Sequence, residues 1–183
     1  MGKVLESLDD FLTEFIQKQK VFFVATAMET GTINLSPKGV DSFRVLGPNR
    51  AIWLNLTGSG NETATQLMHQ NRITVMFCSF EGPPLILRLY GTAEVYHHND
   101  AEWKEFIHLF PTFKGSRQLI DMHIEKVQTS CGFGVPIMEF KEERENLKKW
   151  EERHPDEKIV EYWAMKNHTS FDGHPTHIAD KTQ

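Results

Sequence analysis

The spacing of hydrophobic residues changes from helical to strand-like near residue 20. Between residues 4 and 18 apolar side chains recur every three or four positions, which places them on one face of an amphipathic helix. From residue 21 the apolar residues form short runs rich in β-branched and aromatic types, each bounded by Gly, Pro or Asn. This pattern predicts strands over residues 21–27, 32–35, 42–46, 51–56, 73–80, 85–96 and 119–129.

Helical patterns interrupt and follow these strands. A short helix is expected over residues 62–70, with Asn61 as its N-cap, and a second begins near residue 100. Residues 141–153 hold five basic and five acidic side chains, which favours a solvated helix with short-range ion pairs. A last helix is expected over residues 155–165, because proline suits the first turn of a helix.

Isolated helices among many strands favour a mainly β fold. No strand–helix–strand alternation is present, so a small β-barrel with appended helices is predicted in preference to a doubly wound parallel sheet. The length of 183 residues suits one domain. We expect an N-terminal helix over 1–20, a barrel over 21–138, and C-terminal helices with a polar tail over 139–183.

Composition excludes several classes of partner. The net charge of −5 gives no basic surface for nucleic acid. No apolar run reaches the roughly 20 residues that a membrane-spanning helix needs, so no membrane partner is expected. Cys78 and Cys131 are too few for a disulfide framework and are predicted to be buried, and no secretory signal is apparent. A cytoplasmic location is therefore expected.

The segment from Thr57 to Thr63 (TGSGNET) lies between a predicted strand and a predicted helix. Free backbone N–H groups and the positive end of the helix could bind a phosphate there, and three hydroxyls add donors. It is neither a Walker loop nor a complete dinucleotide fingerprint, because the lysine of the first and the third glycine of the second are missing. The alternative is an ordinary capped turn.

Two basic residues, Arg88 and Lys38, are candidates to contact an anion or a cofactor. Arg88 lies within an apolar strand and needs an anion, either a carboxylate such as Glu62 or Glu94 or a phosphate. Lys38 lies in a polar turn that is either a solvent-exposed loop or, together with the backbone around Ser36, a partner for the redox edge of a flavin ring. The local pattern leaves both pairs of interpretations open.

The histidine-rich tail is a weak metal candidate. His174 and His177, with His168 and Asp172 nearby, could ligate an ion, but scattered histidines in a polar tail are more often solvated. We therefore predict no metal site.

Several motifs together resemble the pyridoxamine 5′-phosphate oxidase-like family of flavin proteins. They are SPKG at 36–39, IWLN at 52–55, TGSGNETATQL at 57–67 and LILRLYGTAEV at 85–95; SCGFGVP at 130–136 and KNHTSFDGHPT at 166–176 are similar to one subgroup. The resemblance implies an FMN-binding split β-barrel that holds the cofactor between the two subunits of a homodimer. Residues 131–136 and 167–173 would then be candidates to reach over the partner's flavin.

The resemblance also assigns residues to the cofactor. It implies that Lys38 lies at the flavin ring, that residues 53–55 lie on the strand beside it, that residues 61–63 lie at the phosphate, and that Arg88 lies on a strand facing the cofactor. With the loop and turn residues identified above, the candidate cofactor-binding set is Ser36, Lys38, Trp53, Leu54, Asn55, Thr57, Asn61, Glu62, Thr63 and Arg88.

Departures from the family pattern limit the expected activity. Glu62-Thr63 replaces an Arg-Lys pair of the oxidases, and the segment that grips the substrate phosphate has no counterpart, although Lys114 and Arg117 could form a substitute. We therefore expect an FMN-dependent oxidoreductase of a small molecule, with NAD(P)H as a candidate donor, that oxidises pyridoxamine 5′-phosphate poorly. The alternatives are a non-enzymatic flavin-binding or sensing protein and a haem-binding relative with His168 or His174 as axial ligand.

Overall fold

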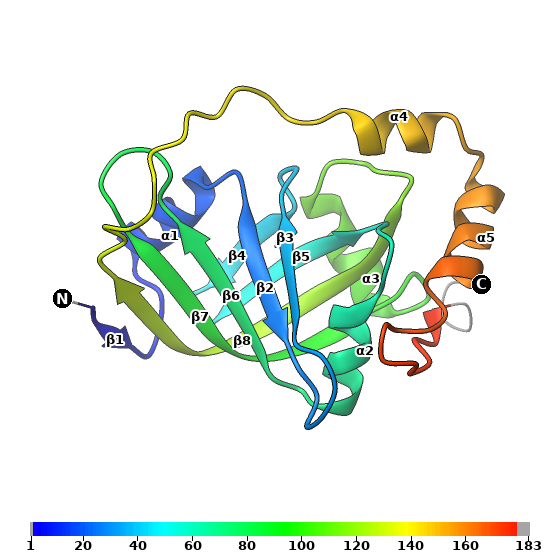
Figure 1. Cartoon of the computed structure of the whole chain (residues 1–183), viewed down its shortest axis with the longest axis horizontal. Coiled ribbons are helices and arrows are strands. Elements are labelled where there is room, and N and C mark those ends of the chain that lie inside the picture. The colour runs from blue at the N-terminus through cyan, green and yellow to red at the C-terminus, as the bar shows by residue number, and fades with distance from the viewer. Residues whose placement is uncertain (1, 179–183) are drawn as a thin grey trace.

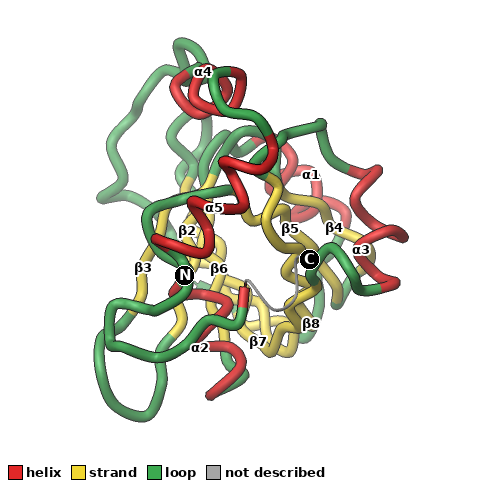
Figure 2. Tube along the Cα trace, turned by 90° about the vertical axis from the view of Figure 1, so that its right-hand side faces the viewer, coloured by secondary structure: helices red, strands yellow, loops and turns green. Residues whose placement is uncertain are grey.

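An antiparallel sheet that curves into a barrel forms the body of the protein, with helices at its ends (Figures 1 and 2). The computed structural model describes residues 2–178. The strands are β1 (Val4–Leu5), β2 (Phe22–Thr26), β3 (Asn34–Lys38), β4 (Phe43–Gly47), β5 (Arg50–Leu56), β6 (Ile73–Cys78), β7 (Ile86–Tyr96) and β8 (Ser116–Ser130). The helices are α1 (Asp10–Lys18), α2 (Glu62–His69), α3 (Ala101–Phe106), α4 (Asn146–Glu152) and α5 (Asp156–Lys166), and a 3₁₀ turn, Ile107–Leu109, follows α3.

Within residues 2–178 the sheet has two edge strands. The order is β3-β2-β6-β7-β8-β5-β4, all neighbouring pairs are antiparallel, and β1 pairs with β8. Strands β3 and β4 thus form opposite edges of the sheet although they are consecutive in the chain. This architecture confirms the predicted mainly β class, a split barrel.

Alternating side chains of the strands pack into two hydrophobic clusters. The inner cluster includes Phe22, Trp53 and Phe77 from three strands, and α1 covers it with buried Leu12 and Ile16. The second cluster lies on the other face of β5 and β8 under α3; its buried members are Ile52, Leu54, Phe110 and Leu119. Because both faces of β5 are buried, this strand is apolar almost throughout.

The predicted N-terminal helix over residues 4–18 is too long. The helix begins at Asp10, because the carboxylate Oδ1 of Asp9 accepts a hydrogen bond of 2.8 Å from the backbone N–H of Leu12 and caps the first turn. Val4 and Leu5, which fit the helical spacing, instead pair with β8. Strand pairing therefore overrides the local periodicity at this end.

The region after β8 also differs from the sequence prediction. Only residues 146–152 of the expected helix over 141–153 are helical, and residues 131–145 run as an irregular strap across the top of the barrel in Figure 1. Cys131 is exposed on this strap, contrary to prediction, whereas Cys78 is buried. Among residues 2–178, no helix combines the length and apolar character needed to cross a membrane.

Gly91 lies at a β-bulge in the pairing of β7 with β8, where a side chain would not fit. The register between these strands shifts between Tyr90 and Gly91, and a Cβ at position 91 would overlap the carbonyl oxygen of His123. We predict that Gly91→Ala lowers the free energy of unfolding by about 1 to 3 kcal/mol, measured by urea denaturation. Gly134→Ala is the control, since its Cβ would meet no atom within 4 Å. Equal stability of the two variants would contradict this account.

Candidate functional site

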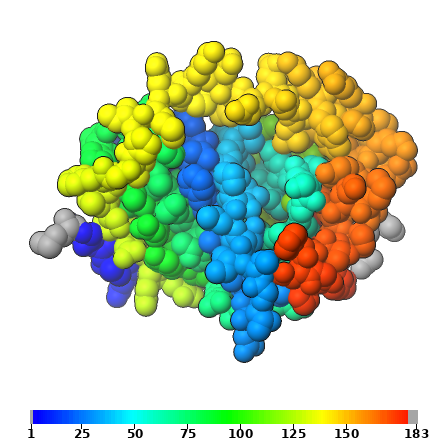
Figure 3. Space-filling model, viewed as in Figure 1, coloured from blue at the N-terminus to red at the C-terminus, as the bar shows by residue number. Residues whose placement is uncertain are grey.

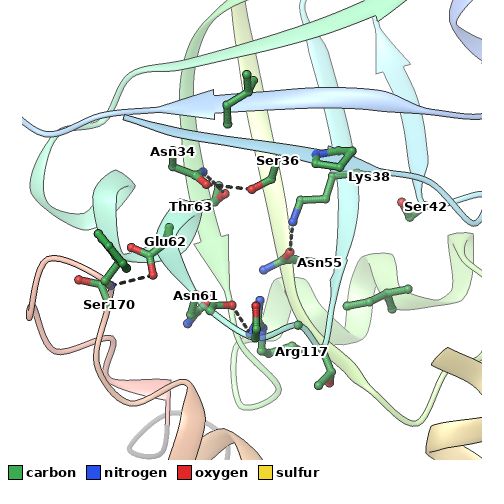
Figure 4. A pocket seen from close by; sticks show the side chains of 18 of the residues that line it. Asn34, Ser36, Lys38, Ser42, Asn55, Asn61, Glu62, Thr63, Arg117 and Ser170 are labelled. Atoms are coloured by element: carbon green, nitrogen blue, oxygen red, sulfur yellow. Dashed lines mark hydrogen bonds between the residues drawn. The ribbon is translucent and has the colours of Figure 1, made fainter. Parts of the chain in front are cut away.

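A polar pocket of about 840 Å³ lies between edge strand β3 and the end of β5 (Figure 4). Its remaining walls come from loop 57–63, from the short link between β3 and β4, and from residues 169–171 near the C-terminus. The last segment packs beside the β2–β3 hairpin in the space-filling view (Figure 3). Segments far apart in sequence therefore build this site together, and its volume is in the range of cofactor-binding clefts.

Strand alternation along β3 supplies one wall. Asn34, Ser36 and Lys38 line the pocket and are less exposed than Leu35 and Pro37, which alternate with them. The sequence prediction of a polar turn here is wrong, because residues 36–38 belong to β3 and pair with β2. Pro37 is tolerated since β3 is an edge strand with one side free of ladder hydrogen bonds.

Lys38 carries its charge into the pocket without a carboxylate partner. Its ammonium Nζ donates to Oδ1 of Asn55 at 3.3 Å, and Asn55 Nδ2 donates in turn to Oε1 of Gln118 at 3.0 Å. No ion pair of Lys38 occurs within residues 2–178. Partial burial and, to a lesser extent, the nearby charge of Arg117 together lower the pKa of Lys38 to about 8.

Arg117 is a second cation that lines the pocket, and unlike Lys38 it is buried. Its side chain is 2% exposed, and Nη1 donates to the carbonyl of Gly60 at 2.9 Å and to Oδ1 of Asn167 at 2.7 Å. Both acceptors are neutral, and in the described part of the chain the guanidinium Nε has no hydrogen-bond partner. Burial lowers the pKa of Arg117 to about 10. Lys38 and Arg117 therefore give the pocket a positive charge that its protein contacts do not neutralise.

Further buried polar atoms without partners lie near the first turn of α2. Asn61 is 2% exposed and occupies the N-cap position, yet its side chain makes no capping bond, contrary to the sequence prediction. Within residues 2–178 its Oδ1 and Nδ2 lack partners, as does Oε2 of Glu62. Buried polar atoms in native proteins are nearly always satisfied. The cluster is therefore suited to a bound hydrogen-bonding group, and the cations beside it favour an anionic one.

Other groups of the loop are already engaged by the protein. The hydroxyl of Thr57 donates to the carbonyl of Gly115 at 2.9 Å and accepts from Nε1 of Trp163 at 2.8 Å. The hydroxyl of Thr63 accepts from Asn34 Nδ2 at 3.0 Å, and Glu62 Oε1 accepts from the N–H of Phe171 at 2.9 Å. These contacts fix the loop and leave the side-chain amide of Asn61 and Oε2 of Glu62 as its unpartnered buried groups among residues 2–178.

The structure brings most of the predicted site residues together. Ser36, Lys38, Leu54, Asn55, Thr57, Asn61, Glu62 and Thr63 all line the pocket. Trp53 does not: its side chain is fully buried in the inner cluster, with its ring centroid 6.3 Å from that of Phe22. That cofactor assignment therefore needs correction, since Trp53 faces the core.

Arg88 is also misplaced by the sequence prediction. It does not line the pocket, and its Nη1 donates to Oγ of Ser130 at 3.2 Å on the neighbouring strand, not to Glu62 or Glu94. The arginine in the pocket is Arg117, which the sequence suggested only as part of a substitute site for a substrate phosphate. The signal that could have identified it is its place at the start of the last sheet strand, opposite the loop that follows β5.

The histidines of the tail do not gather around an ion. No group of three or more His, Cys, Asp or Glu side chains in residues 2–178 is arranged to hold a metal. Asp172 instead accepts hydrogen bonds from the backbone N–H and hydroxyl of Thr32, and the His174 ring lies 5.1 Å from that of His69. No histidine in the described chain lines the pocket.

Comparison with known sequences assigns the chain to a family. A sequence model of the pyridoxamine 5′-phosphate oxidase family matches residues 8–131. The chain belongs to this family. The pyridoxamine 5′-phosphate oxidase family protein ustO of Aspergillus flavus is 42% identical over 139 residues, which are 73% of this chain and 56% of that protein. The chain thus spans little more than half the length of this relative.

Solved structures of low sequence identity share the fold. A protein of Lactobacillus delbrueckii named after pyridoxamine 5′-phosphate oxidase has a TM-score of 0.54 at 20% identity, covering 67% of this chain and 94% of its own. HupZ of Group A Streptococcus has a TM-score of 0.52 at 22% identity, covering 66% and 91%. At these identities the comparisons establish the split barrel of the family and nothing about the ligand.

The depressed pKa of Lys38 predicts how stability depends on pH. Between pH 8 and 10.5 the unfolded chain holds a proton that the folded chain has lost, so the free energy of unfolding rises with pH by at most about 1.4 kcal/mol per unit. Lys38→Met should remove this rise and make the ligand-free protein more stable at pH 7 by about 1 kcal/mol or more. Urea denaturation at pH 7, 8.5 and 10 measures both effects. A variant that is less stable at pH 7 with an unchanged pH slope would refute the assignment.

Proposed function

We propose that the pocket binds FMN and that the protein is an FMN-dependent oxidoreductase acting on a small molecule. The observation that carries this proposal is a pair of pocket cations, the half-buried Lys38 and the buried Arg117, whose hydrogen-bond partners within the described chain are all neutral. A buried charge without a counter-charge is costly, so its presence favours an anionic ligand. In a chain of this family, a flavin phosphate is the ligand that the resemblance of the motifs implies.

The donor set fits a phosphate at one end of the pocket and a polar ring at the other. Arg117 Nε and the side-chain amide of Asn61 are buried, lack partners among residues 2–178, and can donate to phosphate oxygens. Glu62 lies beside them: its Oε1 accepts from the N–H of Phe171 and its Oε2 has no partner among residues 2–178, so its carboxylate offsets only part of the charge of the two cations. We therefore assign the phosphate to the Arg117 side of loop 57–63. Lys38 and Asn55 are the donors for the ring.

When bound, FMN would supply hydride or electron transfer, and the residues of the chain would orient the ring and tune its charge. With a pKa of about 8, Lys38 is mostly protonated at pH 7 and can stabilise negative charge on a neighbouring ring. The amide chain from Asn55 to Gln118 holds the ammonium in place without neutralising it. No general acid or base is required of the protein in this assignment.

We propose that pyridoxamine 5′-phosphate is a poor substrate. Lys114 and Arg117 do not assemble a second anion site: Arg117 is directed to Gly60 and Asn167, while Lys114 Nζ lies 3.8 Å from a carboxylate oxygen of Asp156. We expect FMN-loaded protein to oxidise NAD(P)H with a quinone acceptor and to form little pyridoxal 5′-phosphate with oxygen. Efficient aldehyde formation would contradict the proposal, and inactivity with both substrates would favour the non-enzymatic flavin-binding alternative.

The haem-binding alternative has less support. An axial ligand to haem iron is usually a histidine, a cysteine, a methionine or a tyrosine. None of these side chains lines the pocket within residues 2–178, and the proposed ligands His168 and His174 lie outside it.

We further propose a homodimer with the cofactor at the subunit boundary. Large apolar side chains are exposed around the pocket, among them Ile33 (76%), Leu35 (65%) and Phe171 (82%). A two-fold interface would bury such a surface. Sedimentation velocity at micromolar concentration should give a dimer of the 21.2 kDa chain, and Leu35→Glu should shift it toward monomer. A wild-type monomer that retains FMN would exclude this arrangement.

Arg117 should contribute to phosphate binding specifically. We predict that Arg117→Met weakens FMN binding by about 1.5 to 3 kcal/mol, the range for hydrogen bonds to a charged group, while riboflavin binding changes much less. Isothermal titration of both flavins against the variant measures the difference. The exposed Arg72→Met serves as the control, because it removes the same charge outside the pocket. Equal losses for the two flavins would show that Arg117 does not contact the phosphate.

A further inference from the structure

The C-terminal segment 167–176 is docked onto the walls of the pocket. It lies beyond the residues that match the family model, 8–131, and contains most of the KNHTSFDGHPT string. The N–H of Phe171 donates to Glu62, and Asp172 accepts two hydrogen bonds from Thr32. The segment is therefore held to the first turn of α2 and to the β2–β3 hairpin, independently of the contacts described next.

Asn167, at the start of this segment, joins it to the buried cation. Its side chain is fully buried (0% exposed): Oδ1 accepts from Arg117 Nη1 at 2.7 Å, and Nδ2 donates to the carbonyl of Gly58 at 3.0 Å. Its backbone carbonyl accepts a hydrogen bond from the hydroxyl of Thr176. One amide thus connects the C-terminal segment, the guanidinium and loop 57–63.

Asn167 offers Arg117 a neutral amide oxygen, whereas arginine more commonly pairs with a carboxylate. A carboxylate at the position of Asn167 would form a buried ion pair and cancel the charge of Arg117. The amide oxygen orients the guanidinium by a hydrogen bond but carries no net charge. The second acceptor of Arg117, the carbonyl of Gly60, is also neutral. Arg117 is thus fixed in one orientation by two neutral acceptors, which leave its charge uncancelled.

We propose that Asn167 is a positioning residue that holds Arg117 ready for an anionic group, so that the C-terminal segment sets the affinity of the pocket for a ligand phosphate. This inference rests on the proposed function, because it concerns the phosphate of the same ligand. It adds a residue outside the part of the chain that matches the family model.

Asn167→Asp tests the inference by converting the neutral acceptor of Arg117 into a charged one of nearly the same shape; it also removes the Nδ2 donor to Gly58, a loss that the variant Asn167→Ser shares. The dissociation constants of FMN and riboflavin are measured by isothermal titration on the full chain. We expect FMN binding to weaken by about 10- to 100-fold, the equivalent of one lost hydrogen bond to a charged group. Riboflavin, which has no phosphate, should change by less than about threefold, within the usual scatter of a structural effect.

Two further variants separate positioning from loop docking. Asp172→Asn weakens the attachment of the same segment to Thr32 without touching Arg117, and it should leave the ratio of FMN to riboflavin affinity unchanged. Asn167→Ser removes both amide contacts without adding charge, and it should lower the ratio less than Asn167→Asp does. In an Arg117→Met background, Asn167→Ser should no longer change the ratio, since the residue acts through Arg117.

The outcomes distinguish this inference from the proposed function. If the wild-type protein binds FMN no more tightly than riboflavin, the phosphate assignment fails and the inference fails with it. If the wild type prefers FMN but the ratio is unchanged in both Asn167→Asp and Asn167→Ser, the inference alone is overturned. A selective loss of FMN affinity in Asn167→Asp that exceeds the loss in Asp172→Asn supports it.

Discussion

The site depends on two positive charges, a half-buried lysine and a buried arginine, that are hydrogen-bonded to neutral groups. Transfer of a cation into a protein interior is unfavourable unless a counter-charge compensates it, and the lowered pKa values of Lys38 and Arg117 express this cost. Asn55, Asn167 and the carbonyl of Gly60 orient the two side chains without supplying a negative charge. The pocket is therefore electrostatically incomplete as a protein structure, and an anionic ligand would complete it.

The split barrel explains how these charges come together. Lys38 projects from edge strand β3, whereas Arg117 lies at the start of β8, which is separated from β3 by three strands in the sheet order. The sheet curves round (Figure 2), and residues of both elements line one pocket. The loop after β5 and the C-terminal segment close the remaining sides. The site thus forms only when the sheet closes into a barrel, and no single sequence motif contains all of its residues.

The sequence predicts the strands and the fold class well, because alternation and turn residues are local signals. It predicts the site less well, because burial of a charged side chain depends on tertiary contacts. Arg88 and Arg117 both lie in or beside apolar strands, and only the folded sheet distinguishes the one beside Ser130 from the one in the pocket. Trp53 is assigned to the cofactor by the family resemblance, which places residues 53–55 on the strand beside the ring; because both faces of β5 are apolar, the sequence does not show which of these side chains faces the core. Lys38 is assigned to a polar turn at a strand end, and only the pairing with β2 shows that the strand continues to this residue.

The most direct test of the central claim is the titration of Lys38 by NMR, observed through its ¹³Cε shift in the ligand-free protein and again with FMN bound. The account predicts a pKa of about 8 without ligand and a clear increase when a phosphate-bearing flavin neutralises the pocket, with a smaller increase for riboflavin. A lysine that titrates near 10.5 in the free protein, or whose pKa does not change when FMN binds, would contradict the account.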